Sequence, residues 1–221
     1  MSDFTKGEAG TERGGTTSQG RSSPREYPAE LEFDVTIGDE LHLRIRPIRP
    51  DDAQLLVTFH SRLSTDSVYR RYFSMHPELS DAEVVHLTTV DYFDRLAFIV
   101  QDGTHLVAVG RYDRIPGTTE AEVAFVVADE YQRRGIGLLL LEHLAEEAWR
   151  LGITTFVAET QAGNMDMMGV FENAGFPVTS KIEDEIISVR FPIQPTPESE
   201  RLRAERLTIE QPSDRGYHFE C

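Results

Sequence analysis

Hydrophobic and polar residues repeat with two different periods between residues 31 and 193, and the two periods alternate along the chain. Short runs rich in β-branched and aromatic residues predict strands over 33–37, 41–48, 96–101, 106–112, 120–127, 153–160, 176–182 and 186–191. Helical spacing predicts helices over 51–63, 134–151 and 165–174, and a capping box of Ser80 with Glu83 opens another through Leu87. Helices separate the later strands, so we expect an α/β domain with a mixed sheet.

The two ends of the chain lack this periodicity. Residues 1–30 are rich in Gly, Ser, Thr and Arg, and residues 194–221 combine several prolines with many charges. We therefore expect a disordered N-terminal tail at 1–30, one domain at 31–193 and a flexible acidic C-terminal tail at 194–221. Within that second tail, the segment 202–207 has the composition of a brief helix.

Charge and cysteine content narrow the functional classes. The formal net charge is −16, and residues 31–193 carry 27 acidic and 14 basic residues, which argues against nucleic acid or an anionic membrane as partner. One cysteine, Cys221, allows no disulfide framework, and no signal segment or membrane-length apolar run occurs, so we expect a cytoplasmic protein. The seven histidines lack metal-binding spacing, so no metal is expected.

The strongest local signal lies between the strand at 120–127 and the helix that follows it. A strand that ends at paired glycines and opens a helix presents free backbone N–H groups at the positive end of the helix dipole, which suits a pyrophosphate. A Cβ at either glycine would hold the anion away from the backbone, and two arginines add donors for phosphate oxygens. The candidate cofactor-binding residues here are Gln132, Arg133, Arg134, Gly135, Ile136, Gly137 and Leu138.

Three phosphate-binding interpretations compete for this loop. A nucleoside triphosphatase loop ends in Gly-Lys-Ser/Thr, whereas Leu138 follows Gly137 here. A dinucleotide-binding loop belongs in the first strand–helix unit, whereas this loop lies past the middle of the chain. The third is the acyl-coenzyme A loop of the GNAT family of N-acetyltransferases, with the pattern Gln/Arg-x-x-Gly-x-Gly/Ala. The chain resembles that family over residues 42–192, and an ordinary turn remains as the plain alternative.

This resemblance implies both a fold and a co-substrate. The family has one domain whose mixed, mostly antiparallel central sheet is splayed between two strands and flanked by helices, and it uses acetyl-CoA as acyl donor. In the family, the strand before the loop pairs its backbone with the pantetheine amides, much as a peptide adds to a sheet edge. That role falls here on Phe125, Val126 and Val127.

Glu122 is the candidate catalytic residue. Strand alternation places Glu122, Ala124 and Val126 on one face. A carboxylate among apolar residues is costly without a function or a partner, and desolvation makes carboxylates more basic, as a general base requires. Its place ten residues before Gln132 resembles that of the catalytic glutamate in protein-acetylating members of the family. The alternative is a solvated acid near Glu120.

A second segment resembles the family's Asn…Tyr-x-x-x-Gly-Phe pattern. Asn164 matches the asparagine that contacts coenzyme A, but Phe171 stands at the position of the tyrosine that protonates the departing thiolate. Phenylalanine cannot donate a proton, so water or another group must protonate the leaving group. A thiol has a pKa of about 8.5, so its thiolate is an adequate leaving group without much assistance. Phe171 packs either against the pantetheine or in the core.

Two further segments resemble the bacterial protein-lysine acetyltransferase branch. These are residues 63–74 and 90–95, and the branch implies a protein acceptor such as an acyl-CoA synthetase. It places Asp91, Tyr92 and Asp94 on the acceptor side, although both acids would also suit a turn. A small-molecule amine acetyltransferase and a catalytically silent acyl-CoA-binding sensor are the alternative functions.

Overall fold

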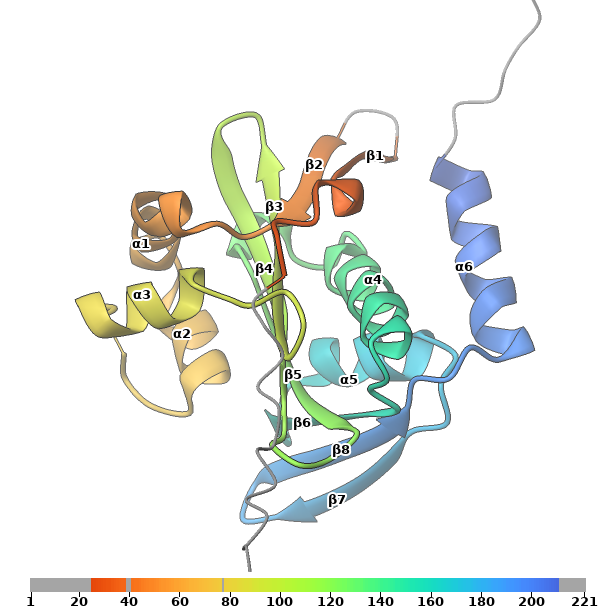
Figure 1. The fold of residues 1–221 in the computed structure, drawn as a ribbon. Coiled ribbons are helices and arrows are strands. Elements are labelled where there is room, and N and C mark those ends of the chain that lie inside the picture. The colour runs from red at the N-terminus through yellow and green to blue at the C-terminus, as the bar shows by residue number, and fades with distance from the viewer. Residues whose placement is uncertain (1–24, 39–40, 77, 211–221) are drawn as a thin grey trace, which may run out of the picture.

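The computed structural model describes residues 25–38, 41–76 and 78–210. Eight strands form one sheet in the order β1-β2-β3-β4-β5-β6-β8-β7, and β5 with β6 is its parallel pair, while the other neighbours are antiparallel (Figure 1). The strands are β1 (Phe33–Ile37), β2 (Leu41–Pro47), β3 (Arg95–Asp102), β4 (His105–Arg114), β5 (Glu120–Val127), β6 (Thr155–Gln161), β7 (Thr179–Glu183) and β8 (Ile186–Pro192).

Helices cover the two faces of the sheet. One face carries the first three α-helices, and the other carries α4 and α5, with α6 beyond α4 (Figure 1). The helices are α1 (Ala53–Ser61), α2 (Thr65–Tyr72), α3 (Asp81–Thr88), α4 (Ile136–Arg150), α5 (Met165–Asn173) and α6 (Pro197–Glu210), with short 3-10 turns η1 (Ala29–Leu31), η2 (Pro50–Asp52) and η3 (Asp129–Tyr131). Among the described residues, no helix is long and apolar enough to cross a membrane.

Each face of the sheet has its own apolar core. Val123 and Phe125 of β5 pack with Leu140 and Leu144 of α4 in the larger core. A smaller core joins α1 to β3 and β4 on the opposite face. Burying each such side chain contributes roughly 1.5–3 kcal/mol, so the period-2 pattern of β5 fixes which of its residues remain available for chemistry.

The parallel pair β5–β6 separates after three residues. Glu120, Ala121 and Glu122 pair with Thr155, Phe156 and Val157, and the register continues no further along β5. Residues 123–127 pair with β4 on their other side. The described part of the sheet is therefore splayed at this point, as the sequence resemblance predicted.

The observed elements follow the predicted ones closely, with two additions. The capping box at Ser80 is present, and β5 has the predicted ends. Helix α2 was not among the predicted helices; Ser64 caps it by accepting from the Ser67 backbone N–H. The C-terminal stretch, expected as a tail with a brief helix, contains α6 over fourteen residues. Strand β7 begins at Thr179 because Gly175 adopts φ +76° and Pro177 follows it.

Candidate functional site

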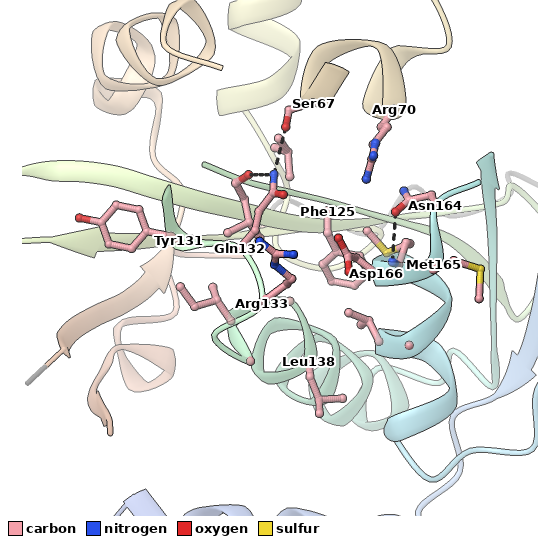
Figure 2. A pocket seen from close by; sticks show the side chains of 18 of the residues that line it. Ser67, Arg70, Phe125, Tyr131, Gln132, Arg133, Leu138, Asn164, Met165 and Asp166 are labelled. Atoms are coloured by element: carbon pink, nitrogen blue, oxygen red, sulfur yellow. Dashed lines mark hydrogen bonds between the residues drawn. The ribbon is translucent and has the colours of Figure 1, made fainter. Parts of the chain in front are cut away.

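A cavity of about 370 Å³ opens where β5 and β6 separate. Its walls come from α2, from the exposed edge of β5, from the loop before α4 and from the first turns of α5 (Figure 2). The lining residues on which the argument below depends are Ser67, Arg70, Arg71, Phe125, Val126, Val127, Gln132, Arg133, Gly135, Ile136, Gly137, Leu138 and Asn164. Most of the predicted cofactor-binding residues are thus brought to one place.

The glycine loop presents unoccupied backbone donors at one end of this cavity. Gly135 is the N-cap of α4 with φ +86° and no side-chain cap, so the first turn of the helix has N–H groups directed at whatever occupies the cavity. A Cβ on Gly135 would touch nothing within 4 Å, so its backbone angle, and not crowding, requires glycine there. A Cβ on Gly137 would lie 3.3 Å from Val170. The loop therefore fits a pyrophosphate.

A hydrogen-bond network ties this loop to α2. The Gln132 side-chain amide donates to the Ser67 hydroxyl at 3.0 Å and to the Val127 carbonyl at 3.1 Å. Ser67 and Ser64 in turn donate to the Asp129 carboxylate at 2.9 and 2.6 Å. Burial alone would raise the pKa of Asp129, but the hydrogen bonds from Ser64 and Ser67 outweigh it and hold that pKa below its ordinary value. The network gives α2 a fixed position over the cavity.

Phe125 forms the apolar wall of the cavity because its neighbour on β4 has no side chain. Phe125 is buried, and a Cβ on Gly110, its cross-strand partner, would lie 2.9 Å from the ring. Val126 and Val127 continue the wall towards the loop. The edge of β5 that faces away from β4 has no strand partner in the described structure over residues 123–127, which leaves backbone groups free for an extended ligand.

Glu122 stands at the point of separation, outside the cavity itself. Its side chain is exposed, so the expected cost of burying the carboxylate does not arise. Glu122 borders a depression of about 560 Å³ over β6, β7 and β8. Asp113 lies directly opposite on β4, and the Arg71 guanidinium attracts Glu122 electrostatically from α2.

Helix α5 contributes Asn164 but not Phe171. Asn164 is buried, lines the cavity and caps α5 by accepting from the Met167 N–H at 3.2 Å. Phe171 is 1% exposed, packs 5.5 Å from the Phe191 ring and does not line the cavity. Six residues of α5 line the cavity, namely Met165, Asp166, Met167, Gly169, Val170 and Asn173, whereas Phe171 belongs to the core.

Arg134 also lies outside the cavity lining. Its guanidinium lies over the Tyr131 ring, 5.4 Å from the centroid, and the side chain is exposed beside the loop. Arg133, by contrast, lines the cavity with its backbone at φ +59°. Arg133 is thus the loop arginine positioned for phosphate oxygens.

The three residues expected on the acceptor side occupy the turn before β3. The Asp91 carboxylate accepts from the Phe93 and Arg95 backbone N–H groups at 2.9 and 2.8 Å. Tyr92 is buried and donates to the Ile48 carbonyl, and Asp94 pairs with Arg114 at 2.7 Å. None of the three lines the cavity or the depression at Glu122, and their contacts are those of a structural turn.

Comparison with known proteins gives consistent matches. Residues 64–176 match the sequence profile of the Acetyltransferase (GNAT) family, and this range contains the whole cavity lining. Acetyltransferase Pat of Mycolicibacterium smegmatis is 32% identical over 134 residues, which are 59% of this chain and 40% of Pat. Acetyltransferase PA5475 of Pseudomonas aeruginosa is 30% identical over 145 residues, 64% of this chain and 78% of that protein.

Among solved structures, the GNAT domain of S. lividans PAT has a TM-score of 0.71 at 39% identity. The match covers 76% of this chain and 99% of that domain. The chain therefore spans nearly all of an isolated domain of this kind, but less than half the length of the Pat protein.

Proposed function

Because this chain belongs to the GNAT family of acetyltransferases, we propose that it transfers the acetyl group of acetyl-CoA to the side-chain amine of lysine on a protein. The observation that carries the proposal is the position of Glu122. It is the last β5 residue paired with β6, so it stands where the acyl-CoA cavity meets the open face of the sheet. Acyl donor and acceptor can meet there from opposite sides.

Acetyl-CoA fits the cavity in one direction. Its pyrophosphate belongs at the backbone donors of Gly135 and Gly137, beside Arg133. Its pantetheine runs along the free edge of β5 at 125–127, and the apolar ring of Phe125 packs against it. This direction brings the thioester to the separation point near Glu122.

Glu122 acts as the general base in this proposal. A lysine side chain with pKa about 10.4 is mostly protonated at neutral pH and must lose a proton to become a nucleophile. The carboxylate takes that proton, directly or through water, while the nitrogen attacks the thioester carbonyl. A free backbone N–H on the open edge of β5 stabilises the oxyanion that develops.

The open face of the sheet supplies the approach for a protein acceptor. Glu122 shares the depression there with Glu159 of β6, whereas Glu120 beside it already pairs with Arg190. In the described structure, neither Glu122 nor Glu159 has an ion-pair partner within 4.0 Å, so two carboxylates remain for a cationic segment. This wide, open surface suits a lysine-bearing protein, and the branch resemblance suggests an acyl-CoA synthetase as a candidate acceptor.

One assay tests this function. The full chain is incubated with acetyl-CoA and, separately, with lysine-rich proteins, an acyl-CoA synthetase, a polyamine and an aminoglycoside, and released CoASH is measured together with acetyl-lysine by mass spectrometry. We expect acetyl-lysine on protein acceptors. Turnover with the small amines alone would assign a small-molecule acetyltransferase, and acetyl-CoA binding with no turnover would assign a sensor.

A further inference from the structure

We propose that Arg71 stabilises the departing coenzyme A thiolate, and so takes the place of the tyrosine proton donor that this chain lacks. Phe171 stands at the tyrosine position and is buried in the core, away from the cavity. The inference rests on the acyl-CoA site proposed above. It concerns the leaving group, whereas the proposed roles of Glu122 and of the free edge of β5 concern the amine and the oxyanion.

Arg71 lies at the thioester end of the cavity. It lines the cavity from α2 and also borders a small second cavity of about 30 Å³, together with Ala124 and Val126 of β5. Arg71 is four residues, about 6 Å, along α2 from Ser67, which Gln132 holds at the loop. The guanidinium interacts electrostatically with Glu122, Asp113 and Arg111, which lie on the side where β5 leaves β6.

The guanidinium has no hydrogen-bonding partner of its own. In the part of the chain that the structure describes, Arg71 has no acceptor within 3.5 Å and no carboxylate within 4.0 Å; its one close contact is the Tyr72 ring, 5.2 Å from the centroid. Removal from water lowers the pKa of Arg71, although an arginine remains charged at neutral pH. Arg71 is half-buried, so its guanidinium has lost part of its hydration without gaining a partner, and an anionic ligand would offset that cost.

Four other polar side chains of the cavity are already engaged. Arg70 pairs with Asp66 at 2.8 Å. The Tyr131 hydroxyl donates to Asp102 at 2.8 Å, which makes it a poor proton donor towards the cavity. Ser67 and Asn164 serve the loop network and the α5 cap. Arg71 is left as the cation at the inner end, among the described residues, with no such engagement.

The surrounding charges allow Arg71 to exchange one anion for another. Glu122 and Asp113 attract it and Arg111 repels it, but Asp113 is held by Arg95 and Arg111 at 2.6 and 2.9 Å. Glu122 is thus the carboxylate that Arg71 balances before the reaction. On the open face beyond Glu122, the charged groups are Glu159, Lys181 and Arg190.

The chemical step moves this negative charge across Arg71. The lysine ammonium gives one proton to Glu122, whose carboxylate becomes neutral, and the freed amine nitrogen forms a bond to the thioester carbonyl carbon while its extra proton passes to water. The C–S bond breaks, its electron pair stays on sulfur, and the thiolate later takes a proton from water. Arg71 therefore faces one negative charge before the step, on Glu122, and one after it, on sulfur, so its position beside the sulfur favours the transition state.

A titration of bound CoASH tests the inference without turnover. The chain has one cysteine, so a Cys221→Ser background leaves the ligand as the sole thiol. Difference absorbance of the thiolate is followed against pH for CoASH-saturated protein. We expect the bound thiol to ionise about one pH unit or more below the free value of about 8.5, and Arg71→Met to remove that shift. Arg71→Lys, which keeps the charge, and Arg62→Met, which removes an exposed arginine outside the cavity lining, should both retain it.

The kinetic counterpart separates leaving-group stabilisation from a structural effect. Arg71→Met should lower kcat about 10²-fold with little change in the KM for acetyl-CoA. When the acyl donor is an acetyl thioester of a more acidic thiol, the loss of kcat should be smaller, because that thiolate needs less stabilisation. Arg71→Gln replaces Arg71→Met if the latter does not fold. An unshifted bound thiol in the parent protein, or an equal loss with both donors, overturns the inference. Failure of the parent protein to bind CoASH overturns the proposed function instead.

Discussion

The Gln132 side chain donates to the Ser67 hydroxyl at 3.0 Å and so connects the anion-binding loop to the helix that covers the cavity. The same amide donates to the carbonyl of Val127, so one side chain joins three walls of the site. This connection matters for function because α2 also carries Arg71. Loop geometry and the position of α2 are therefore expected to respond together to mutation.

Ser67→Ala and Gln132→Ala should each weaken acetyl-CoA binding several-fold, because each breaks the hydrogen bond between Gln132 and Ser67, worth about 1 kcal/mol, together with one further bond. The fold-loss of affinity in the double variant should be smaller than the product of the two single fold-losses, since both changes break the same hydrogen bond. Calorimetric titration of the three variants measures the coupling. Thr58→Ala, which removes a similar hydroxyl bond on α1, is the matched control. Strictly additive losses would mean that the link does not position the loop.

Gly135→Glu should abolish acetyl-CoA binding. The substitution places a side chain at φ +86° and adds a negative charge where the pyrophosphate is expected. Gly117→Glu controls for backbone strain, because Gly117 also has φ +76° and open space around its Cβ but lies in the turn between β4 and β5. Calorimetry should show binding by the control alone; unchanged affinity of folded Gly135→Glu would remove the loop assignment.

Much of this architecture could be predicted from the sequence because its signals are local. The alternation in β5, the capping box at Ser80 and the glycines after β5 each act within a few residues. The role proposed for Arg71 could not be predicted, because it depends on how α2 packs against β5 and β6. Tyr92 illustrates the opposite case, since its place in the family's pattern did not reveal that its hydroxyl bonds to Ile48 in the core.

His143 should make the stability of the fold depend on pH. Burial lowers its pKa from 6.5 to about 4, with Arg203 contributing and Glu146 opposing, and its ring packs 4.2 Å from that of Phe33. Between about pH 6.5 and 4, the imidazole of His143 is protonated in the unfolded chain but neutral in the folded one. The stability that this difference affects is therefore fully present above pH 6.5 and is lost as the pH falls towards 4.

Urea unfolding at pH 7 and pH 5 measures the effect of His143. We expect a loss of about 2 kcal/mol from this group over the interval, superimposed on the contributions of other groups. His143→Gln cannot bind the proton and should flatten the dependence by that amount. An unchanged slope in the variant would mean that His143 is hydrated in solution.

Glu122→Gln should slow acetyl transfer about 10²-fold or more while leaving acetyl-CoA affinity nearly intact, because Glu122 lies outside the cavity that holds the donor. The loss should shrink as the pH rises, since more of the lysine is then a free amine. Glu159→Gln is the matched control: it removes a carboxylate from the same open face, but from β6 instead of the separation point. It should leave kcat unchanged and raise the KM for a cationic protein acceptor by a salt-sensitive amount. Pre-steady-state transfer rates and acceptor titrations at two ionic strengths separate these effects. If Glu122→Gln keeps full turnover at neutral pH, the carboxylate is a solvated surface acid and the base lies elsewhere.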